Sequence, residues 1–560
     1  MKLLWADINA SYSHSNLAFP AMEAQLPEKI RRLCEWKVIS GTTKSPQEEL
    51  IMQITNFEPQ FIFATGWLFN ITYLTRLIEK CKVLMPETEV VLGGPEFLGD
   101  NSLFLQSHPC ISALFKGEGE EIFPELIEKI LSGEQNGKGI PAWKGLPGVE
   151  YLLDGNYISK ESVRVKNFKM LVPPEESQFF NWDKPFVQLE SSRGCFNGCR
   201  FCVSGISDSN VEEIEYEVME KRLDNILLHG IKEIRLLDRT FNGNCKRAVK
   251  LLGLFEKFSG RLKFHLEIHP AFINRELAEK LSGIKEGLLH VEAGLQSLHE
   301  PAIRACNRKG GAEAAFKGVR KLLGYKRFQV HTDLIAGLPG YSHKQLLADI
   351  GRLVSTGADE IQLELLKVLP GTCFREKSNE FGLKYSPFPP YEVLATGQSG
   401  YRELYLAKIL SKILEYWYND PAWRGFTMKA TALEPEFLEE LAIFLQKLNF
   451  LDTPYSAEGK SLLLYGFCKK NHPNLLTLFT LFWVRAGLSL KKEPAGPLRK
   501  WHIEKNEVPN PHFDASSRTI NYFYLDYDGQ RHWFLFDYTA ERHKPAKEFS
   551  DFLNYGINID

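Results

Sequence analysis

Two hydrophobic patterns alternate along the N-terminal part of the chain. In segments such as 71–85 and 116–130 the apolar residues recur at helical spacing. Short apolar runs typical of buried strands separate these segments: MKLLWADI (1–8), FIFATGW (61–67), TEVVLGG (88–94) and SALF (112–115). Strands that alternate with helices predict a parallel, doubly wound α/β sheet over residues 1–132.

The predicted strands of this sheet end in small and polar residues. Ligands of doubly wound sheets bind at the carboxyl ends of the strands. Gly, Ser, Thr and Asn at such ends let a ligand approach the backbone closely. Tight turns alone would explain any one end, but all four together indicate a ligand site: Asn9–His14, Thr65–Trp67, Gly93–Glu96 and Gly117–Gly119.

A second β/α series follows residues 133–183, a segment that begins with many Gly, Pro and Lys and is predicted to be a linker. Strand candidates then alternate with helices, near FVQLE, EIRLLD, FHLEIH, LHVEAGL, VHTDLIAGL and EIQLELL. Six such units predict a partial (β/α)6 barrel over residues 184–375. Its catalytic groups are expected at the carboxyl ends of the strands.

Residues 376–560 predict a C-terminal α+β domain that is mostly helical. Residues 399–419 and 434–448 have helical patterns, and 519–538 alternate around Asp528-Gly529, a strong hairpin signal. The many aromatic residues of this region could line a substrate cleft or stack nucleobases. Tyr and Phe that alternate in a hairpin more often form one packed face, and we favour that interpretation.

Composition and charge exclude few functions. The chain has 560 residues, 44% of them hydrophobic, and a formal net charge of −2. The near-neutral charge does not indicate nucleic acid or an acidic membrane as a partner, although it does not exclude nucleic acid. The first residues turn polar too early for a signal peptide, and the longest apolar run (475–484) is too short to span a bilayer. We expect a cytoplasmic protein.

Three of the ten cysteines are concentrated in SSRGCFNGCRFC, at Cys195, Cys199 and Cys202. Clustered cysteines in a reducing compartment bind metal or act in catalysis more often than they form disulfides. Three thiolates can hold three irons of a [4Fe-4S] cluster and leave the fourth open. A structural zinc site would need a fourth ligand from elsewhere in the chain, and this is the alternative.

The triplet resembles the signature of radical S-adenosylmethionine (SAM) enzymes, Cys-x3-Cys-x2-Cys with an aromatic residue, here Phe201, before the last cysteine. It follows the first predicted barrel strand, as in that family. The resemblance implies that the open iron chelates SAM and that an electron passed to the sulfonium yields a 5′-deoxyadenosyl radical. An external flavodoxin- or ferredoxin-type donor would supply the electron.

The resemblance continues at the later strand ends of the barrel. It implies that Asp238 contacts the methionyl amino group and that Arg308 pairs with the SAM carboxylate. It implies further SAM contacts for Glu267, Gln296 and Asp333, whereas Glu292 could equally hold the barrel together. LKVLPGT (366–372) also recurs in this branch of the family.

The N-terminal domain, with LGGPE and KGEGEE, resembles the Rossmann-like (flavodoxin-like) cobalamin-binding domain of the B12-dependent radical SAM class. The Asp-x-His-x-x-Gly motif is absent, which implies cobalamin bound without a protein histidine, with cobalt above Gly66–Leu68. The residues implied to contact the corrin are Ser13, His14, Thr65, Gly66, Trp67, Gly93, Gly94, Pro95, Gly117 and Glu118.

The function that these resemblances imply is reductive cleavage of SAM, most simply to methylate an unactivated carbon of a substrate that the sequence does not identify. Two alternatives stay open: a B12-dependent radical cyclisation or rearrangement without methyl transfer, and a non-catalytic module that binds a cluster or RNA. A methylthiotransferase is less favoured, because no second N-terminal cysteine triplet is present.

Overall fold

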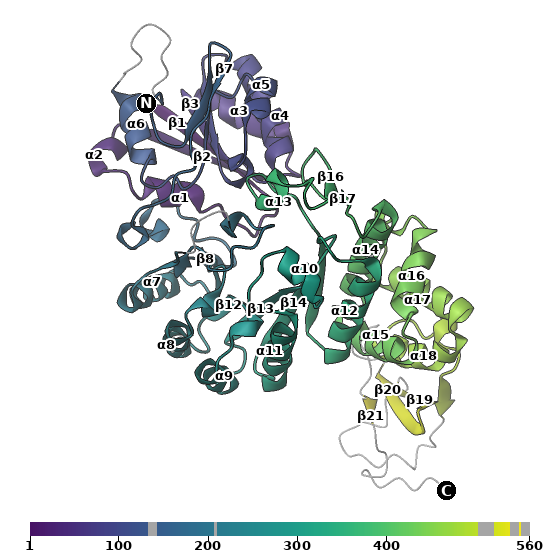
Figure 1. The fold of residues 1–560 in the computed structure, drawn as a ribbon. Coiled ribbons are helices and arrows are strands. Elements are labelled where there is room, and N and C mark those ends of the chain that lie inside the picture. Colours follow the sequence, from purple (N-terminus) through teal and green to yellow (C-terminus); the bar gives the residue numbers. More distant parts are fainter. Residues whose placement is uncertain (133–142, 206–209, 502–519, 538–547, 550–560) are drawn as a thin grey trace. The chain divides into compact units, whose positions relative to one another are not determined.

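The computed structural model describes residues 1–132, 143–205, 210–501, 520–537 and 548–549. The chain forms two compact units, which we describe separately. The first contains Met1–His343 and Leu365–Leu404, and the second contains Lys344–Glu364 and Tyr405–Asp560. Both are mixed in secondary structure (Figure 1).

The first unit begins with a doubly wound sheet. Its strands β1 (Lys2–Asn9), β2 (Glu35–Thr42), β3 (Phe61–Thr65), β4 (Glu89–Gly93) and β5 (Ala113–Phe115) are parallel and lie in the order β2-β1-β3-β4-β5. This is the flavodoxin-like order, so the predicted fold class is confirmed. Strand β2 was not predicted because it lies at the edge of the sheet and is only half-buried, which weakens its apolar pattern.

Helices cover both faces of this sheet. Leu50 and Ile54 of α3 (Gln47–Phe57), together with α4 (Ile71–Leu84), pack into one apolar cluster. The opposite cluster contains Phe19 of α1 (Ala18–Glu23) and Phe123 of α6 (Phe123–Leu131), against Trp5 and Phe63 of the strands. The short helices α2 (Glu28–Arg31) and α5 (Ser102–Ser107) complete this part of the unit.

Part of the segment predicted as a linker belongs to this sheet. Strands β6 (Val149–Leu153) and β7 (Asn156–Ile158) pair antiparallel and extend the sheet beyond β5. The buried Glu150 accepts hydrogen bonds from Asn101 Nδ2 (2.7 Å) and Tyr157 Oη (2.8 Å). Tertiary pairing therefore overrides the Gly- and Pro-rich composition on which the linker prediction rested.

Gly117 follows β5 and pairs with Val163, a residue beyond β7, in a close backbone contact that requires glycine. Its φ is +116°, and a Cβ there would lie 2.1 Å from the Val163 carbonyl oxygen. We expect Gly117→Ala to destabilise the protein by about 2–4 kcal/mol, because it combines backbone strain with overpacking. Thermal unfolding would measure the loss.

Gly155 is the matched control for this substitution. Its φ is also positive, at +78°, but a Cβ added there would meet no atom within 4 Å. Gly155→Ala should cost about 1 kcal/mol from backbone strain alone. Equal losses for the two variants would show that the contact with Val163 does not matter.

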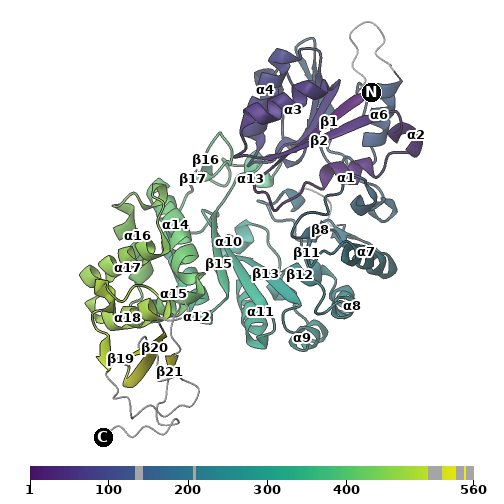
Figure 2. The same cartoon turned by 180° about the vertical axis from the view of Figure 1, so that it is seen from behind.

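The second sheet of this unit forms most of the barrel. Strands β8 (Val187–Leu189), β11 (Glu233–Leu236), β12 (Lys263–Ile268), β13 (Leu289–Gln296) and β14 (Gln329–Ala336) are each parallel to the next. Helices α7 (Tyr216–Leu228), α8 (Cys245–Glu256), α9 (Arg275–Ser282), α10 (Glu300–Ala305) and α11 (Ala312–Tyr325) alternate with them along the chain (Figure 2). The sixth expected strand, β15 (Glu360–Leu365), follows α12 (His343–Thr356).

Burial alternates strictly along the barrel strands. In β12 the apolar Phe264, Leu266 and Ile268 are buried, whereas His265 and Glu267 between them are half-buried. The same alternation holds in β13 and β14, with one polar side chain at almost every second position. One face of the sheet therefore packs in the core, and the other presents titratable groups.

A short segment after the barrel returns to the first sheet. It contains α13 (Cys373–Glu376), β16 (Lys384–Tyr385) and β17 (Val393–Ala395). The Tyr391 hydroxyl donates a hydrogen bond to the buried Glu96 carboxylate, and the Arg375 guanidinium lies over the Tyr391 ring. These contacts connect the end of the barrel to the strand ends of the N-terminal sheet.

The second unit is mainly helical. Its described elements include α14 (Tyr401–Ile413), a π-helical turn at Leu414–Tyr418, α15 (Pro421–Leu433), α16 (Phe437–Gln446), α17 (Ala457–Asn471) and α18 (Leu476–Arg485). The predicted hairpin forms between β19 (Ile520–Tyr527) and β20 (Gln530–Asp537), and the sheet also contains β18 (Arg499–Trp501) and β21 (Glu548–Phe549).

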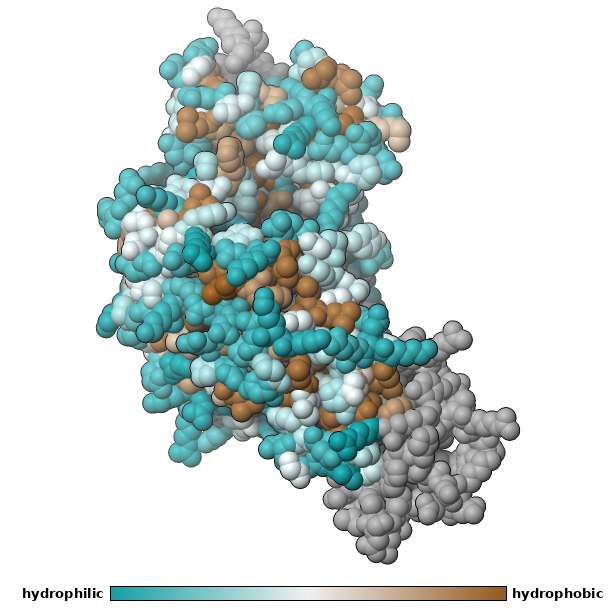
Figure 3. All heavy atoms as spheres, turned by 90° about the vertical axis from the view of Figure 1, so that its right-hand side faces the viewer, coloured by the Kyte–Doolittle hydropathy of each residue, from teal (hydrophilic) through white to brown (hydrophobic). Residues whose placement is uncertain are grey.

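Aromatic residues of this unit mostly pack in its interior. Trp417, Tyr418, Trp423, Trp533 and Phe534 are buried, in agreement with the core interpretation. The face shown in Figure 3 is largely hydrophilic, with apolar side chains in separate patches. Within the described residues, no helix is both long enough and apolar enough to cross a membrane.

Candidate functional site

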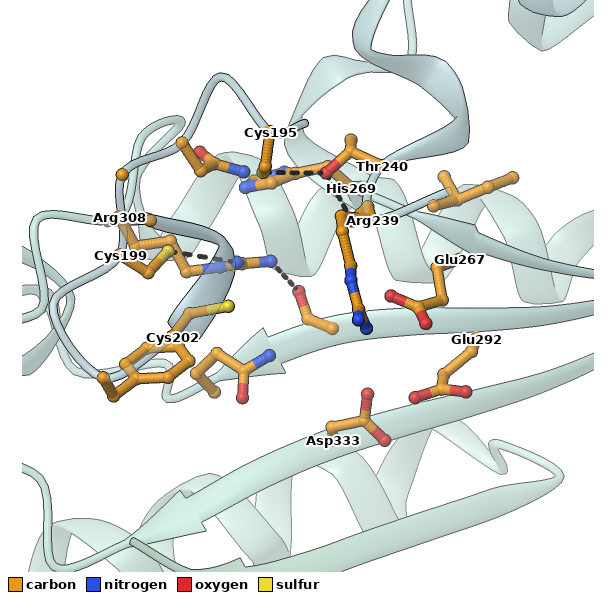
Figure 4. Close-up of a pocket in the computed structure, with 17 residues that line it drawn as sticks. Cys195, Cys199, Cys202, Arg239, Thr240, Glu267, His269, Glu292, Arg308 and Asp333 are labelled. Atoms are coloured by element: carbon orange, nitrogen blue, oxygen red, sulfur yellow. Dashed lines mark hydrogen bonds between the residues drawn. The ribbon is translucent and has the colours of Figure 1, made fainter. Parts of the chain in front are cut away.

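The cysteine triplet lines a small cavity at the carboxyl ends of the barrel strands. The loop after β8 supplies Cys195, Cys199 and Cys202, and the opposite wall comes from the ends of β12, β13 and β14 (Figure 4). The cavity volume is about 190 Å³. Of the residues expected around SAM, those that line the cavity are Phe201, Glu267, Glu292, Gln296, Arg308 and Asp333.

Arg308 connects the thiols to the strand ends. Its Nη1 lies 3.7 Å from Cys199 Sγ, and its Nη2 donates to the Gly294 carbonyl oxygen at 2.7 Å. Burial raises the pKa of the Cys199 thiol above its ordinary value, and the guanidinium offsets only part of this rise. Cys195 Sγ lies 3.7 Å from Thr240 Oγ1. A cationic group at the thiols favours the thiolate form that binds metal.

The thiols do not converge on a single point. Within the part of the chain that the structure describes, no group of three His, Cys, Asp or Glu side chains is arranged to hold one metal ion. Thiolates that each bind a different iron of a cluster do not need to converge. The donor set, three thiols on one loop, fits a cluster of this kind.

Three carboxylates face the thiols across the cavity, and their environments differ. Burial, with repulsion from Glu292, raises the pKa of Glu267 to about 7. Burial and the same neighbour raise the pKa of Asp333 well above its ordinary value. Glu292 accepts a hydrogen bond from His265 Nε2 at 3.1 Å, which lowers its pKa. Burial and mutual repulsion therefore disfavour the simultaneous ionisation of these carboxyls, and a cationic ligand beside them would offset that repulsion.

The charge on Glu267 should make stability depend on pH. Its ordinary pKa of 4.5 is raised to about 7 in the fold, so ionisation costs stability progressively as pH rises through this range. Without SAM, we expect Glu267→Gln to be more stable than wild type at pH 8, by up to roughly 3 kcal/mol in the free energy of unfolding. At pH 4 the two proteins should differ little. Glu233→Gln is the control, since Glu233 is half-exposed and paired with Arg235 at 2.9 Å, and its substitution should not stabilise the protein at pH 8.

Asp238 is not among the residues that line the cavity, and its expected contact with the methionyl amino group stays a prediction. Its carboxylate is fully buried and accepts hydrogen bonds from the backbone N–H and the hydroxyl of both Ser191 and Ser192, at 2.5–2.9 Å. Asp238 thus supports the strand end that precedes the cysteine loop. Its neighbour Arg239, which the sequence interpretation missed, lines the cavity instead.

A larger cavity of about 650 Å³ lies between the N-terminal sheet and the barrel, within the first unit. The strand ends of the N-terminal sheet line it with six of the residues expected around a corrin: Thr65, Gly93, Gly94, Pro95, Gly117 and Glu118. Trp5, Phe63 and Phe123 add an aromatic wall. Gly94 has a φ of +108°, and a Cβ there would lie 2.6 Å from Thr65 Cγ2, so the chain passes close to β3 only with glycine at this position.

Four residues expected at the corrin do not line this cavity: Ser13, His14, Gly66 and Trp67. A Cβ on Gly66 would lie 2.7 Å from the Phe97 ring, so Phe97 occupies the space beside it. His14 Nδ1 lies 2.7 Å from Ser11 Oγ, and its ring meets the edge of Phe186. The β1 loop therefore packs on the start of the barrel, which sequence spacing could not show.

The barrel side of the larger cavity carries an ion network that sequence reasoning missed. Arg193 Nη1 lies 2.8 Å from Glu120 Oε1 and 3.8 Å from Glu118 Oε2, and its Nη2 pairs with Glu190. Arg193 stands two residues before Cys195, so this network connects the cysteine loop to the N-terminal sheet. The only sequence signal for this ion network is the group of glutamates in KGEGEE (116–121).

Comparisons with known proteins agree with this geometry. Residues 189–353 match the Radical SAM superfamily, and residues 379–476 match a family described as a protein of unknown function (DUF4080). An uncharacterised methyltransferase of Pyrococcus horikoshii is 24% identical over 62% of this chain and 76% of its own length. The cobalamin-dependent radical SAM methyltransferase TokK of Streptomyces tokunonensis is 22% identical over 59% of this chain, which spans only 50% of that protein.

Solved structures share the fold. The radical SAM methyltransferase TsrM from Kitasatospora setae, solved with cobalamin and a [4Fe-4S] cluster, superposes with a TM-score of 0.55 over 69% of this chain and 79% of its own, at 16% identity. The cobalamin-dependent radical enzyme OxsB superposes with a TM-score of 0.58 over 86% of this chain and 78% of its own, at 14% identity.

Residues 189–353 therefore contain a radical SAM domain, and the thiol-lined cavity lies at the strand ends of this domain. The fold, with a flavodoxin-like sheet before the barrel, is like that of TsrM and OxsB.

Proposed function

We propose that this protein is a cobalamin-dependent radical SAM methyltransferase that acts on an unactivated carbon. One observation carries the proposal. The loop at 194–205 forms the wall between the two cavities, with its three cysteines toward the smaller cavity and Gly194, Val203 and Ser204 toward the larger. A radical source and a methyl carrier would thus be neighbours.

In this proposal the three cysteines hold a [4Fe-4S] cluster, and Arg308 pairs with the carboxylate of SAM. Gln296 and the carboxylates at the ends of β12–β14 bind the ribose hydroxyls and offset the positive charge of the ligand. When bound, the cofactors supply the chemistry: the cluster provides the electron that cleaves SAM, and the corrin carries the methyl group. An external reductant of the flavodoxin or ferredoxin type delivers the electron.

The larger cavity would hold cobalamin. Glycines at the ends of β4 and β5 and the aromatic wall suit a large, mostly apolar ring. Among the described residues that line it there is no histidine, which favours binding without an imidazole ligand to cobalt.

The experiment that tests this proposal begins with anaerobic reconstitution and metal analysis. About four irons per chain are expected for the cluster, with one cobalt for the corrin. The loaded protein is then incubated with dithionite, methyl-deuterated SAM and a small-molecule cell extract. A product that gains the labelled methyl supports methylation. 5′-Deoxyadenosine without any labelled product would favour rearrangement, and zinc in place of iron would overturn the proposal.

A further inference from the structure

Arg239 is the residue that the two cavities share. It follows β11 and is the only described residue that lines both the small thiol cavity and the large cavity. Figure 4 shows its side chain directed into the small cavity, on the side of Glu267. The side chain of Arg239 is therefore placed to contact a ligand in either cavity.

The Arg239 guanidinium is in direct contact with no anionic group in the part of the chain that the structure describes, although its charge acts on Glu267 across the cavity and lowers the pKa of that carboxyl. Among the described residues this guanidinium makes no hydrogen bond or ion pair; only the Arg239 carbonyl oxygen accepts one, from Thr240 Oγ1 at 2.6 Å. The other guanidiniums nearby are engaged: Arg193 pairs with three glutamates, and Arg308 contacts Gly294 and Cys199. An unpaired charge at a cavity wall has a low desolvation free energy only when water or a ligand anion contacts it.

The cofactors do not account for this second cation in the small cavity. SAM has one carboxylate, and Arg308 lies at the thiols where that carboxylate would bind. The rest of SAM is cationic or neutral. Resting on the proposed function, we propose that Arg239 binds an anionic group of the substrate, a carboxylate or a phosphate, at the junction of the two cavities. Guanidinium is suited to both because it can donate two parallel hydrogen bonds.

Binding to the reconstituted, SAM-loaded holoenzyme tests this assignment. The probes are a defined set of small carboxylates and phosphate monoesters at millimolar concentration, each with its neutral methyl ester. Equilibrium dialysis with mass spectrometry measures retention. Wild type should retain at least one acid but not its ester. Arg239→Gln should lose about tenfold or more in affinity for it, and Arg239→Lys should retain part. Whether a carboxylate or a phosphate is retained identifies the group.

Controls separate this proposal from the function on which it rests. Arg235→Gln removes a guanidinium of β11, the strand that Arg239 follows; Arg235 lines neither cavity, and this variant should bind the acid normally. Arg239→Gln should keep its SAM affinity and its cobalt content. If Arg239→Gln binds SAM more weakly, Arg239 contacts SAM. If it binds cobalamin more weakly but binds phosphate-free cobinamide normally, Arg239 contacts the cobalamin phosphate. Either result would overturn the proposal. The proposal would also be overturned if the wild-type protein retained the neutral esters, or if it retained none of the acids. Failure to load iron and cobalt would instead refute the proposed function.

Discussion

Cys199→Ala is expected to abolish reductive cleavage of SAM, with a loss of more than about 100-fold in 5′-deoxyadenosine, since two thiolates do not hold the cluster. Cys199 is buried at the centre of the triplet, with its sulfur 3.7 Å from Arg308 Nη1. Iron content should fall in parallel. Cobalamin binding should persist, because Cys199 does not line the larger cavity.

Cys110→Ala is the control for this result. Cys110 is half-buried in the N-terminal sheet domain and lines neither cavity, so iron content and SAM cleavage should stay at the wild-type level. The assays are iron analysis and chromatography of 5′-deoxyadenosine after reduction with dithionite. Cleavage that survives in Cys199→Ala would refute the cluster assignment.

Arg308→Gln is expected to weaken SAM binding by about 10- to 100-fold, the cost of losing a charge-assisted contact to a buried carboxylate. The substitution removes the cation that lies between Cys199 and the Gly294 carbonyl. Iron should still load, because all three thiols remain. Equilibrium dialysis of labelled SAM against the reconstituted protein measures the change.

Arg304→Gln provides the matched control, since Arg304 is an exposed residue of α10 that lines neither cavity. It should bind SAM with wild-type affinity. If Arg308→Gln binds SAM normally but loses iron, the role of Arg308 is to stabilise the thiolates and not to hold the ligand carboxylate.

The two pairs of variants probe different layers of the site. The cysteines set whether a cluster can form, and Arg308 sets how firmly a carboxylate is held beside it. The stability of Glu267→Gln measures the effect of the negative charge on the cavity wall opposite the thiols. Loss of cleavage with iron and SAM binding both intact would point beyond these residues to the delivery of electrons.

The sequence by itself determined the elements that depend on local pattern. The sequence pattern predicts ten strands because each is a short apolar run with clear ends: β1, β3, β4, β5 and the six barrel strands. The cysteine triplet was readable because its ligands lie within one loop, so their spacing alone predicts that they act together. The hairpin around Asp528-Gly529 was readable from its turn residues.

Only the tertiary structure decided which strand-end residues share a cavity. Asp238 and Arg239 are adjacent in sequence, yet one is buried under Ser191 and Ser192 and the other lines both cavities. The pairing of β6 and β7 with the first sheet, and the packing of His14 on Phe186, join segments far apart in the chain. Such contacts depend on the direction and packing of individual side chains, which a one-dimensional pattern does not specify.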